Sequence, residues 1–126
     1  MTIPFLCLLI AVVIPYVLSA LVGRYRAEQF GSVDMRHPRA QQRALEGKGA
    51  RAQAAHDNAR EILPVFASAV FVSHLNGGDP RPAAALSIVF VATRILHPVL
   101  YIGDQPMARA GVFLVGLGCC IALFFV

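Results

Sequence analysis

IPFLCLLIAVVIPYVLSALV, the stretch Ile3–Val22, is apolar almost throughout and contains no charged side chain. A helix needs about 20 apolar residues to cross about 30 Å of hydrocarbon, so the stretch predicts a membrane-spanning helix. Its small residues at Ser19 and Ala20 are also typical of a secretion signal. In such a signal the positive charge precedes the apolar core, whereas here Arg24 and Arg26 follow it. We therefore expect a retained membrane anchor.

The rest of the chain has the same character. Of its 126 residues, 57% are hydrophobic and 14% are charged, and the mean hydropathy of +0.64 is too high for a soluble domain of this length. Three more stretches approach spanning length: about Ile62–Leu75, extended backward into the polar turns Arg51–Glu61; Pro82–Ile102; and Ala108–Val126. We predict an all-α integral membrane protein, a four-helix bundle that forms a single domain over residues 1–126.

Basic residues are concentrated between the first two apolar cores: Arg24, Arg26, Arg36, Arg39, Arg43, Lys48, Arg51 and Arg60. Arg81 is alone in the next connection. Connections rich in Lys and Arg stay in the cytoplasm, so we expect a multi-pass protein of a bacterial inner membrane with its first loop cytoplasmic and both chain ends on the other side. The positive surplus indicates contact with membrane lipid. Nucleic acid is not an expected partner, because no basic face is interleaved with aromatic residues.

The connections between the helices follow from turn-forming residues. Gly23–Gly49 mixes glycine, proline and charge, so we expect a loop there, partly helical around Ala40–Leu45. The sequences NGGDP (Asn76–Pro80) and GDQP (Gly103–Pro106) predict the later turns. His56 is expected at an interfacial or solvated position.

The cysteines give no sign of redox or metal chemistry. Cys7, Cys119 and Cys120 lie in apolar sequence without a Cys-x-x-Cys spacing, which favours buried small hydrophobes. No His, Cys, Asp or Glu grouping has the spacing of metal ligands, so no metal is expected.

Six polar side chains form two stripes: Arg51, Asn58 and Glu61 on the second expected helix, and Arg94, His97 and Tyr101 on the third. Within each stripe the helical spacing places the side chains on or near one face. Ionisable groups are costly in membrane-spanning segments, so these stripes are the expected functional residues. The alternative for Asn58 and Glu61 is interhelical hydrogen bonding that only fixes the fold, and His97 can instead cap carbonyls freed by the neighbouring proline.

The segment RAQAAHDNAREILPVF (Arg51–Phe66) resembles the second-helix signature of the MAPEG superfamily, the membrane-associated proteins of eicosanoid and glutathione metabolism. That signature has an Arg, then an Asn, then a Glu three residues on, and a Pro another three on. RILHPVLY (Arg94–Tyr101) looks like the family's Arg-x-x-His-x-x-x-Tyr pattern, and Arg109 resembles an arginine early in its fourth helix. The similarity covers nearly the whole chain and is that of a bacterial-type member.

The resemblance implies a homotrimer with an active site between subunits, glutathione as cofactor, and a hydrophobic small-molecule substrate that enters from the lipid. The function it implies is that of a membrane-bound glutathione-dependent transferase or peroxidase acting on hydrophobic electrophiles or lipid hydroperoxides. Arg109 is the expected catalytic residue, because a nearby guanidinium favours the thiolate form of a thiol. Arg24 is the second choice. The expected glutathione-binding residues are Arg51, Asn58, Glu61, Arg94, His97 and Tyr101.

These residues suit different parts of the tripeptide. Arg51 and Arg94 suit its carboxylates, because a guanidinium can hold a carboxylate with two hydrogen bonds. Glu61 can accept its amine, while Asn58 and Tyr101 supply neutral hydrogen bonds. Tyr101 can alternatively point at the thiol.

The chain also departs from its glutathione-using relatives. They commonly carry a further Arg where this chain has Ala54, and often other basic groups where it has Asp57. A non-catalytic lipid-binding or scaffold protein of the same fold is therefore the alternative function. A small four-helix exporter ranks third, because it would need a membrane-buried acid in the first helix, and Ile3–Val22 contains none.

Overall fold

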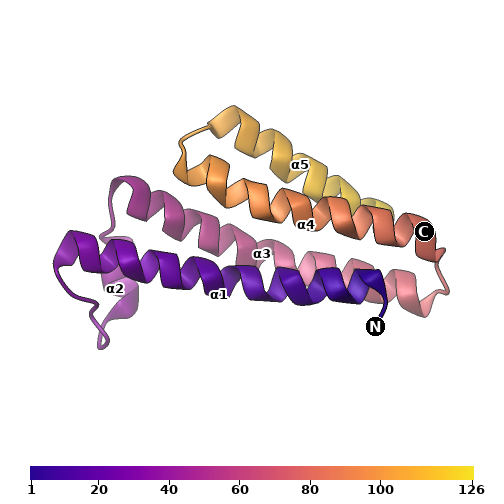
Figure 1. The fold of residues 1–126 in the computed structure, drawn as a ribbon, viewed down its shortest axis with the longest axis horizontal. Coiled ribbons are helices and arrows are strands. Elements are labelled where there is room, and N and C mark those ends of the chain that lie inside the picture. Colours follow the sequence, from indigo (N-terminus) through magenta and orange to yellow (C-terminus); the bar gives the residue numbers. More distant parts are fainter.

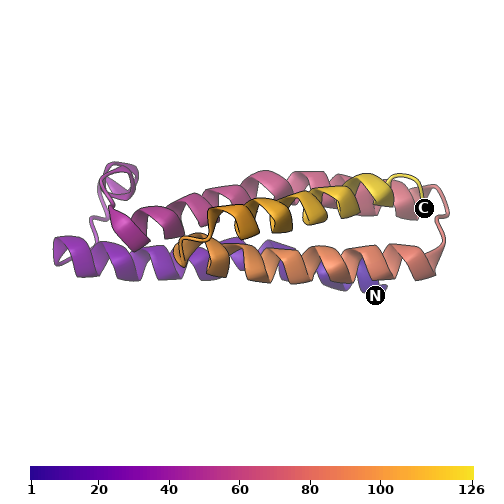
Figure 2. The ribbon, with the colours of Figure 1, turned by 90° about the horizontal axis from the view of Figure 1, so that it is seen from above.

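The computed structural model describes residues 1–126 and contains helices only, which confirms the all-α prediction (Figure 1). The helices are α1 (Ile3–Phe30), α2 (Pro38–Arg43), α3 (Gly47–Leu75), α4 (Pro80–Ile102) and α5 (Pro106–Leu123). Figure 2 shows the long helices extended along one direction, with the short α2 standing off at one end. Both chain ends lie at the opposite end from α2 (Figure 1).

Three helices are long and apolar enough to cross a membrane: α1, α4 and α5. The prediction of a membrane protein is therefore supported, with three helices able to cross a membrane where four were expected. Although α3 is 29 residues long, its first half carries Lys48, Arg51, Asp57, Arg60 and Glu61. These charges lower its apolar character below that of the other three helices.

The first helix is longer than expected, so the expectation that the loop begins at Gly23 is wrong. α1 continues to Phe30, and Arg24 and Glu28 form an ion pair of 3.1 Å across one turn of this extension. The helix ends where Gly31 adopts a left-handed conformation with φ of 81°, which residues with a Cβ rarely adopt. By contrast, the expected short helix after it is present as α2, and α3 runs without a break from its charged half into its apolar half.

The connection between α1 and α3 is held by a small polar network. Arg26 is buried and donates through Nε to Gln41 Oε1 at 2.6 Å and through Nη2 to the Asp34 carbonyl at 2.8 Å. The backbone N–H groups of His37 and Arg36 each donate to Asp34 Oδ1 at 2.9 Å. These hydrogen bonds, that of His37 first, hold the pKa of Asp34 below its ordinary value. The network docks α2 against the end of α1.

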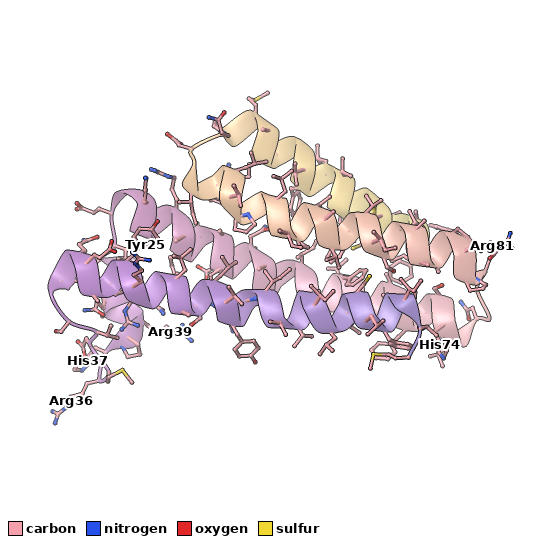
Figure 3. The ribbon with its side chains drawn as sticks, in the orientation of Figure 1. Tyr25, Arg36, His37, Arg39, His74 and Arg81 are labelled. Atoms are coloured by element: carbon pink, nitrogen blue, oxygen red, sulfur yellow. The ribbon has the colours of Figure 1, made fainter.

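The apolar core lies between the four long helices. Its centre is the pair Phe66 and Phe90, whose stacked rings have centroids 3.8 Å apart and join α3 to α4. The three cysteines are buried in this core as free thiols, as expected of small hydrophobes. Charged and polar side chains lie at both ends of the molecule: Arg36 and His37 project near α2, and His74 and Arg81 lie at the other end (Figure 3).

Candidate functional site

A buried arginine joins α4 to α3. Arg94 is only 3% exposed, and its Nη1 donates to Asn58 Oδ1 at 3.1 Å. Its guanidinium carbon lies 5.6 Å from the ring centroid of Phe90 and 5.8 Å from that of Phe113, within the range of cation–π attraction. Nη2 of Arg94 is buried and has no hydrogen-bond partner. The two polar stripes therefore meet at this hydrogen bond.

α5 can lie this close to the Arg94 guanidinium only because residue 116 is glycine. A Cβ added to Gly116 would lie 2.6 Å from Thr93 Oγ1 and 3.2 Å from Arg94 Nη2. Thr93 Oγ1 is itself held by donating to the Phe90 carbonyl at 2.6 Å. A larger residue would displace α5 or disturb the arginine.

A cavity of about 370 Å³ opens beside this hydrogen bond, between α3, α4 and α5. Its lining residues are Asn58, His97, Tyr101, Arg109, Ala110, Phe113 and Leu114. The volume lies within the range of small-molecule sites, and the mixture of apolar wall and a few convergent polar groups is typical of them.

The polar groups of the cavity contact one another in a row. The Arg109 guanidinium carbon lies 4.0 Å from the centroid of the Tyr101 ring, and the His97 ring meets Tyr101 edge-on with centroids 5.7 Å apart. His97 is buried. Arg109 is thereby oriented by an aromatic face, with no carboxylate bound to it.

Three residues predicted for the site lie outside the cavity lining: Arg94, Arg51 and Glu61. Arg51 donates through Nε to the Ile102 carbonyl at 3.1 Å, so it fastens α3 to the end of α4. Glu61 is exposed on α3 and makes no hydrogen bond or ion pair within the chain. The structure thus gathers Asn58, His97, Tyr101 and Arg109 around one cavity, with Arg94 directly behind Asn58. The ligand-binding and catalytic roles of these seven residues stay predictions.

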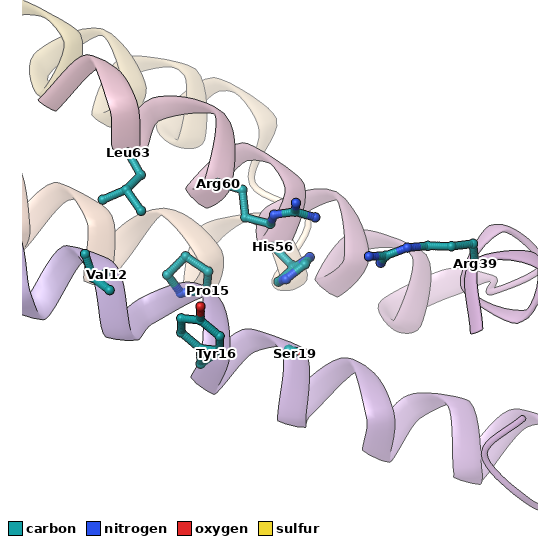
Figure 4. Close-up of a pocket in the computed structure, with 8 residues that line it drawn as sticks. All are labelled: Val12, Pro15, Tyr16, Ser19, Arg39, His56, Arg60 and Leu63. Atoms are coloured by element: carbon teal, nitrogen blue, oxygen red, sulfur yellow. The ribbon is translucent and has the colours of Figure 1, made fainter. Parts of the chain in front are cut away.

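A second cavity, also of about 370 Å³, lies between α1 and α3 and was not expected from the sequence (Figure 4). It is lined by Val12, Pro15, Tyr16, Ser19, Arg39, His56, Arg60 and Leu63. His56 was expected to be interfacial or solvated, but it is buried against α1 with 7% exposure. The i, i+4 spacing of His56 and Arg60 was a usable signal. No sequence signal indicated that Arg39 of α2 would line this cavity, because its position depends on how α2 packs against the other helices.

These features define an all-helical membrane protein with an open cavity that is lined by polar and apolar side chains of three helices. The MAPEG family model matches residues 3–126, and the chain belongs to this family. The family covers glutathione transferases and peroxidases and proteins of eicosanoid synthesis. A comparison with curated proteins finds no match to the chain.

Proposed function

We propose that this chain is a membrane-bound, glutathione-dependent transferase or peroxidase that acts on hydrophobic electrophiles or lipid hydroperoxides. The proposal rests on the family and on one observation. Asn58, His97, Tyr101 and Arg109 come from three helices to line a single cavity of about 370 Å³. Phe113 and Leu114 supply the apolar wall that a hydrophobic substrate needs.

Arg109 is the residue proposed to activate the thiol. Its guanidinium favours the negatively charged thiolate over the neutral thiol, and the thiolate is the nucleophile. In conjugation, the thiolate sulfur forms a bond to the electrophilic carbon and the leaving group departs with its electron pair. In peroxide reduction, the sulfur attacks one peroxide oxygen and the O–O bond breaks. The alkoxide takes a proton from water, and a second glutathione reduces the sulfenic acid to give disulfide and water.

The remaining predicted residues would hold the tripeptide. Asn58 lines the cavity, and the buried positive charge of Arg94 behind it favours a carboxylate at this wall. Tyr101 and His97 supply hydrogen bonds from α4. Arg51 of α3, which donates to the Ile102 carbonyl at the end of α4, would bind the second carboxylate in exchange for that carbonyl.

We also propose that the active form is a homotrimer in which α3 is the fourth membrane-crossing helix of each bundle. Glu61 is exposed, unpaired, and followed by the apolar half of α3. An unpaired acid facing lipid is costly, whereas a neighbouring protomer can cover it and place it where the glutathione amine binds. The basic connection around α2 is proposed to face the cytoplasm of a bacterial inner membrane.

The test is the titration of the glutathione thiol by ultraviolet thiolate absorbance, with and without saturating protein. Wild-type protein should lower the apparent pKa of the bound thiol by about one unit or more. Arg109→Ala should return it toward the free value, while Arg81→Ala, which removes an arginine from the opposite end, should behave as wild type. An unchanged titration with wild-type protein contradicts the proposal.

A non-catalytic lipid-binding protein of the same fold is the second proposal, favoured by two observations. Ala54 stands where glutathione-using relatives commonly carry an arginine. Arg109 already has a partner in the Tyr101 ring at 4.0 Å, so its presence has a purely structural explanation. The same titration separates the two, because a lipid-binding protein leaves the thiol unperturbed.

A further inference from the structure

Arg109 lies where its own helix does not favour a positive charge. It is within the first turn of α5, which contains no acidic side chain, and Gln105 before it provides no side-chain cap. The N-terminal end of a helix carries a partial positive charge, so a guanidinium in the first turn is repelled. Arg109 also takes part in none of the ion pairs of the chain. Another contact must therefore hold this side chain in the cavity wall.

The ring of Tyr101 is that contact. The Arg109 guanidinium carbon lies 4.0 Å from the ring centroid, well inside the range of roughly 6 Å over which a ring attracts a cation. Both residues are half-buried, and removal from water strengthens this attraction. An aromatic ring carries no net charge, so the guanidinium keeps its full positive charge while it is held.

A neutral ring suits an arginine that acts on an anion. A carboxylate would also hold a guanidinium, through two hydrogen bonds, but it would place a negative charge beside the thiolate. A negative charge nearby raises the pKa of a thiol and so opposes its activation. The Tyr101 ring fixes Arg109 without this penalty.

The Tyr101 ring is itself fixed by His97, one helical turn earlier on α4. The two rings meet edge-on, with centroids 5.7 Å apart and planes inclined by 74°, which is a favoured arrangement of aromatic rings. His97 is buried with 4% exposure, and the centroid of its ring lies 6.4 Å from that of Phe113 on α5. A rotation of the Tyr101 ring away from Arg109 would therefore displace a side chain that is confined between two helices.

We propose that Tyr101 is a positioning residue whose ring holds the Arg109 guanidinium in the cavity wall, with His97 fixing that ring. This inference rests on the proposed function, because it requires Arg109 to activate the glutathione thiol. The role of the ring is separate from the hydrogen bond proposed for the Tyr101 hydroxyl. Removal of the hydroxyl alone should therefore leave Arg109 in place, whereas removal of the ring should release it.

The first experiment observes the stacked pair without glutathione. In protein labelled with ¹⁵N-arginine, the Arg109 Nε–Hε resonance is assigned as the one that Arg109→Lys removes. It should be shifted upfield by the ring current of Tyr101. Tyr101→Phe should keep the upfield shift, Tyr101→Leu should abolish it and His97→Ala should reduce it, while the other arginine resonances stay in place and report an intact fold. An equal shift in Tyr101→Leu and wild type would overturn the inference.

The second experiment repeats the glutathione thiol titration with the same variants, using enough protein to bind all of the glutathione. Tyr101→Phe should lower the apparent pKa of the thiol as wild type does. Tyr101→Leu should lose most of this lowering, as Arg109→Ala does. The control Phe125→Leu removes an exposed ring beyond the far end of α5 and should behave as wild type.

The outcomes of this titration separate the inference from the proposed function. If wild-type protein leaves the thiol unperturbed, the proposed function fails and the inference fails with it. If wild type and Tyr101→Leu lower the pKa of the thiol equally, only the positioning role is overturned. If Tyr101→Phe loses as much of the lowering as Tyr101→Leu, the hydroxyl and not the ring is responsible, which also overturns the inference.

Discussion

Arg94 is a positive charge that has been taken out of water without an acid beside it. It is 3% exposed and forms no ion pair. Burying a charge is costly unless hydrogen bonds and favourable electrostatic contacts replace water. Asn58 supplies the hydrogen bond, and the faces of Phe90 and Phe113 supply the electrostatic contact. Asn58 therefore both lines the cavity and stabilises the charge behind it.

Asn58→Ala tests this double role. It removes the acceptor from a buried charged donor, which should lower the free energy of unfolding by about 2 kcal/mol. Thermal unfolding in detergent, followed by circular dichroism, measures the change. Asn76→Ala is the control, because Asn76 is exposed and makes no side-chain hydrogen bond. Equal melting temperatures for the two variants would show that the Arg94 hydrogen bond adds nothing to stability.

Sequence reasoning places residues on helix faces but does not pair them across helices. Periodicity placed Arg94, His97 and Tyr101 on one helix, and two of them, His97 and Tyr101, line the same cavity. It could not show that Arg94 bonds Asn58, or that Arg51 holds the Ile102 carbonyl, because such pairings depend on the axial offset between helices. Glu61 illustrates the same limit. Its spacing predicted a site shared with Arg51 and Asn58, but within one chain its side chain is exposed and has no partner.

The contact between α4 and α5 depends on a single missing Cβ. Gly116→Ala would place a methyl group against Thr93 and Arg94, and overpacking of this kind should destabilise by about 1–3 kcal/mol. Gly111→Ala is the matched control on the same helix, because a Cβ there meets nothing within 4 Å. The control should be neutral or stabilising by about 1 kcal/mol from helix propensity. Urea unfolding of both variants in detergent gives the comparison. A Gly116→Ala protein as stable as the control would show that the helices can separate freely.

The connection between α1 and α2 should respond to acid. The lowered pKa of Asp34 means that its carboxylate stabilises this connection at all pH values above its unfolded pKa. The stabilisation should disappear as the pH falls through the lower, folded pKa. Hydrogen-exchange protection factors of the Arg36 and His37 amides, whose N–H groups donate to Asp34, should therefore fall on acidification.

Asp34→Ala should show low protection at those two amides at every pH. Amides in the middle of α1 serve as the internal control, because they have no contact with Asp34. Protection of Arg36 and His37 that persists to about pH 2 in the wild type would rule out the carboxylate as its source.

Helix boundaries show where local rules compete. A glycine and two arginines after Val22 suggested a loop, yet α1 continues to Phe30 because helix-forming residues and the Arg24–Glu28 pair extend it. The left-handed Gly31 is the true stop. The charged half of α3 was correctly joined to its apolar half, since Ala52, Ala55 and Ala59 maintain the helix through the polar turns.

At the scale of the whole molecule, two cavities of about 370 Å³ lie on two sides of α3. One is bounded by α4 and α5 and is lined by Arg109, the predicted catalytic residue, and by three of the predicted binding residues, Asn58, His97 and Tyr101. The other is bounded by α1 and α2 and is basic. Composition alone predicted the membrane class, because so apolar a chain has no soluble alternative. It could not predict the second cavity, since the positions of α2 and of Arg39 are set by the buried Arg26 network.

The central claim is that the cavity lined by Asn58, His97, Tyr101 and Arg109 binds glutathione at a boundary between protomers. A structure of the purified protein at saturating glutathione tests it most directly. We predict three copies around one axis, with the thiol beside Arg109 and the amine near Glu61. A cavity that stays empty or holds only lipid under those conditions, or a tripeptide bound elsewhere, would contradict the claim.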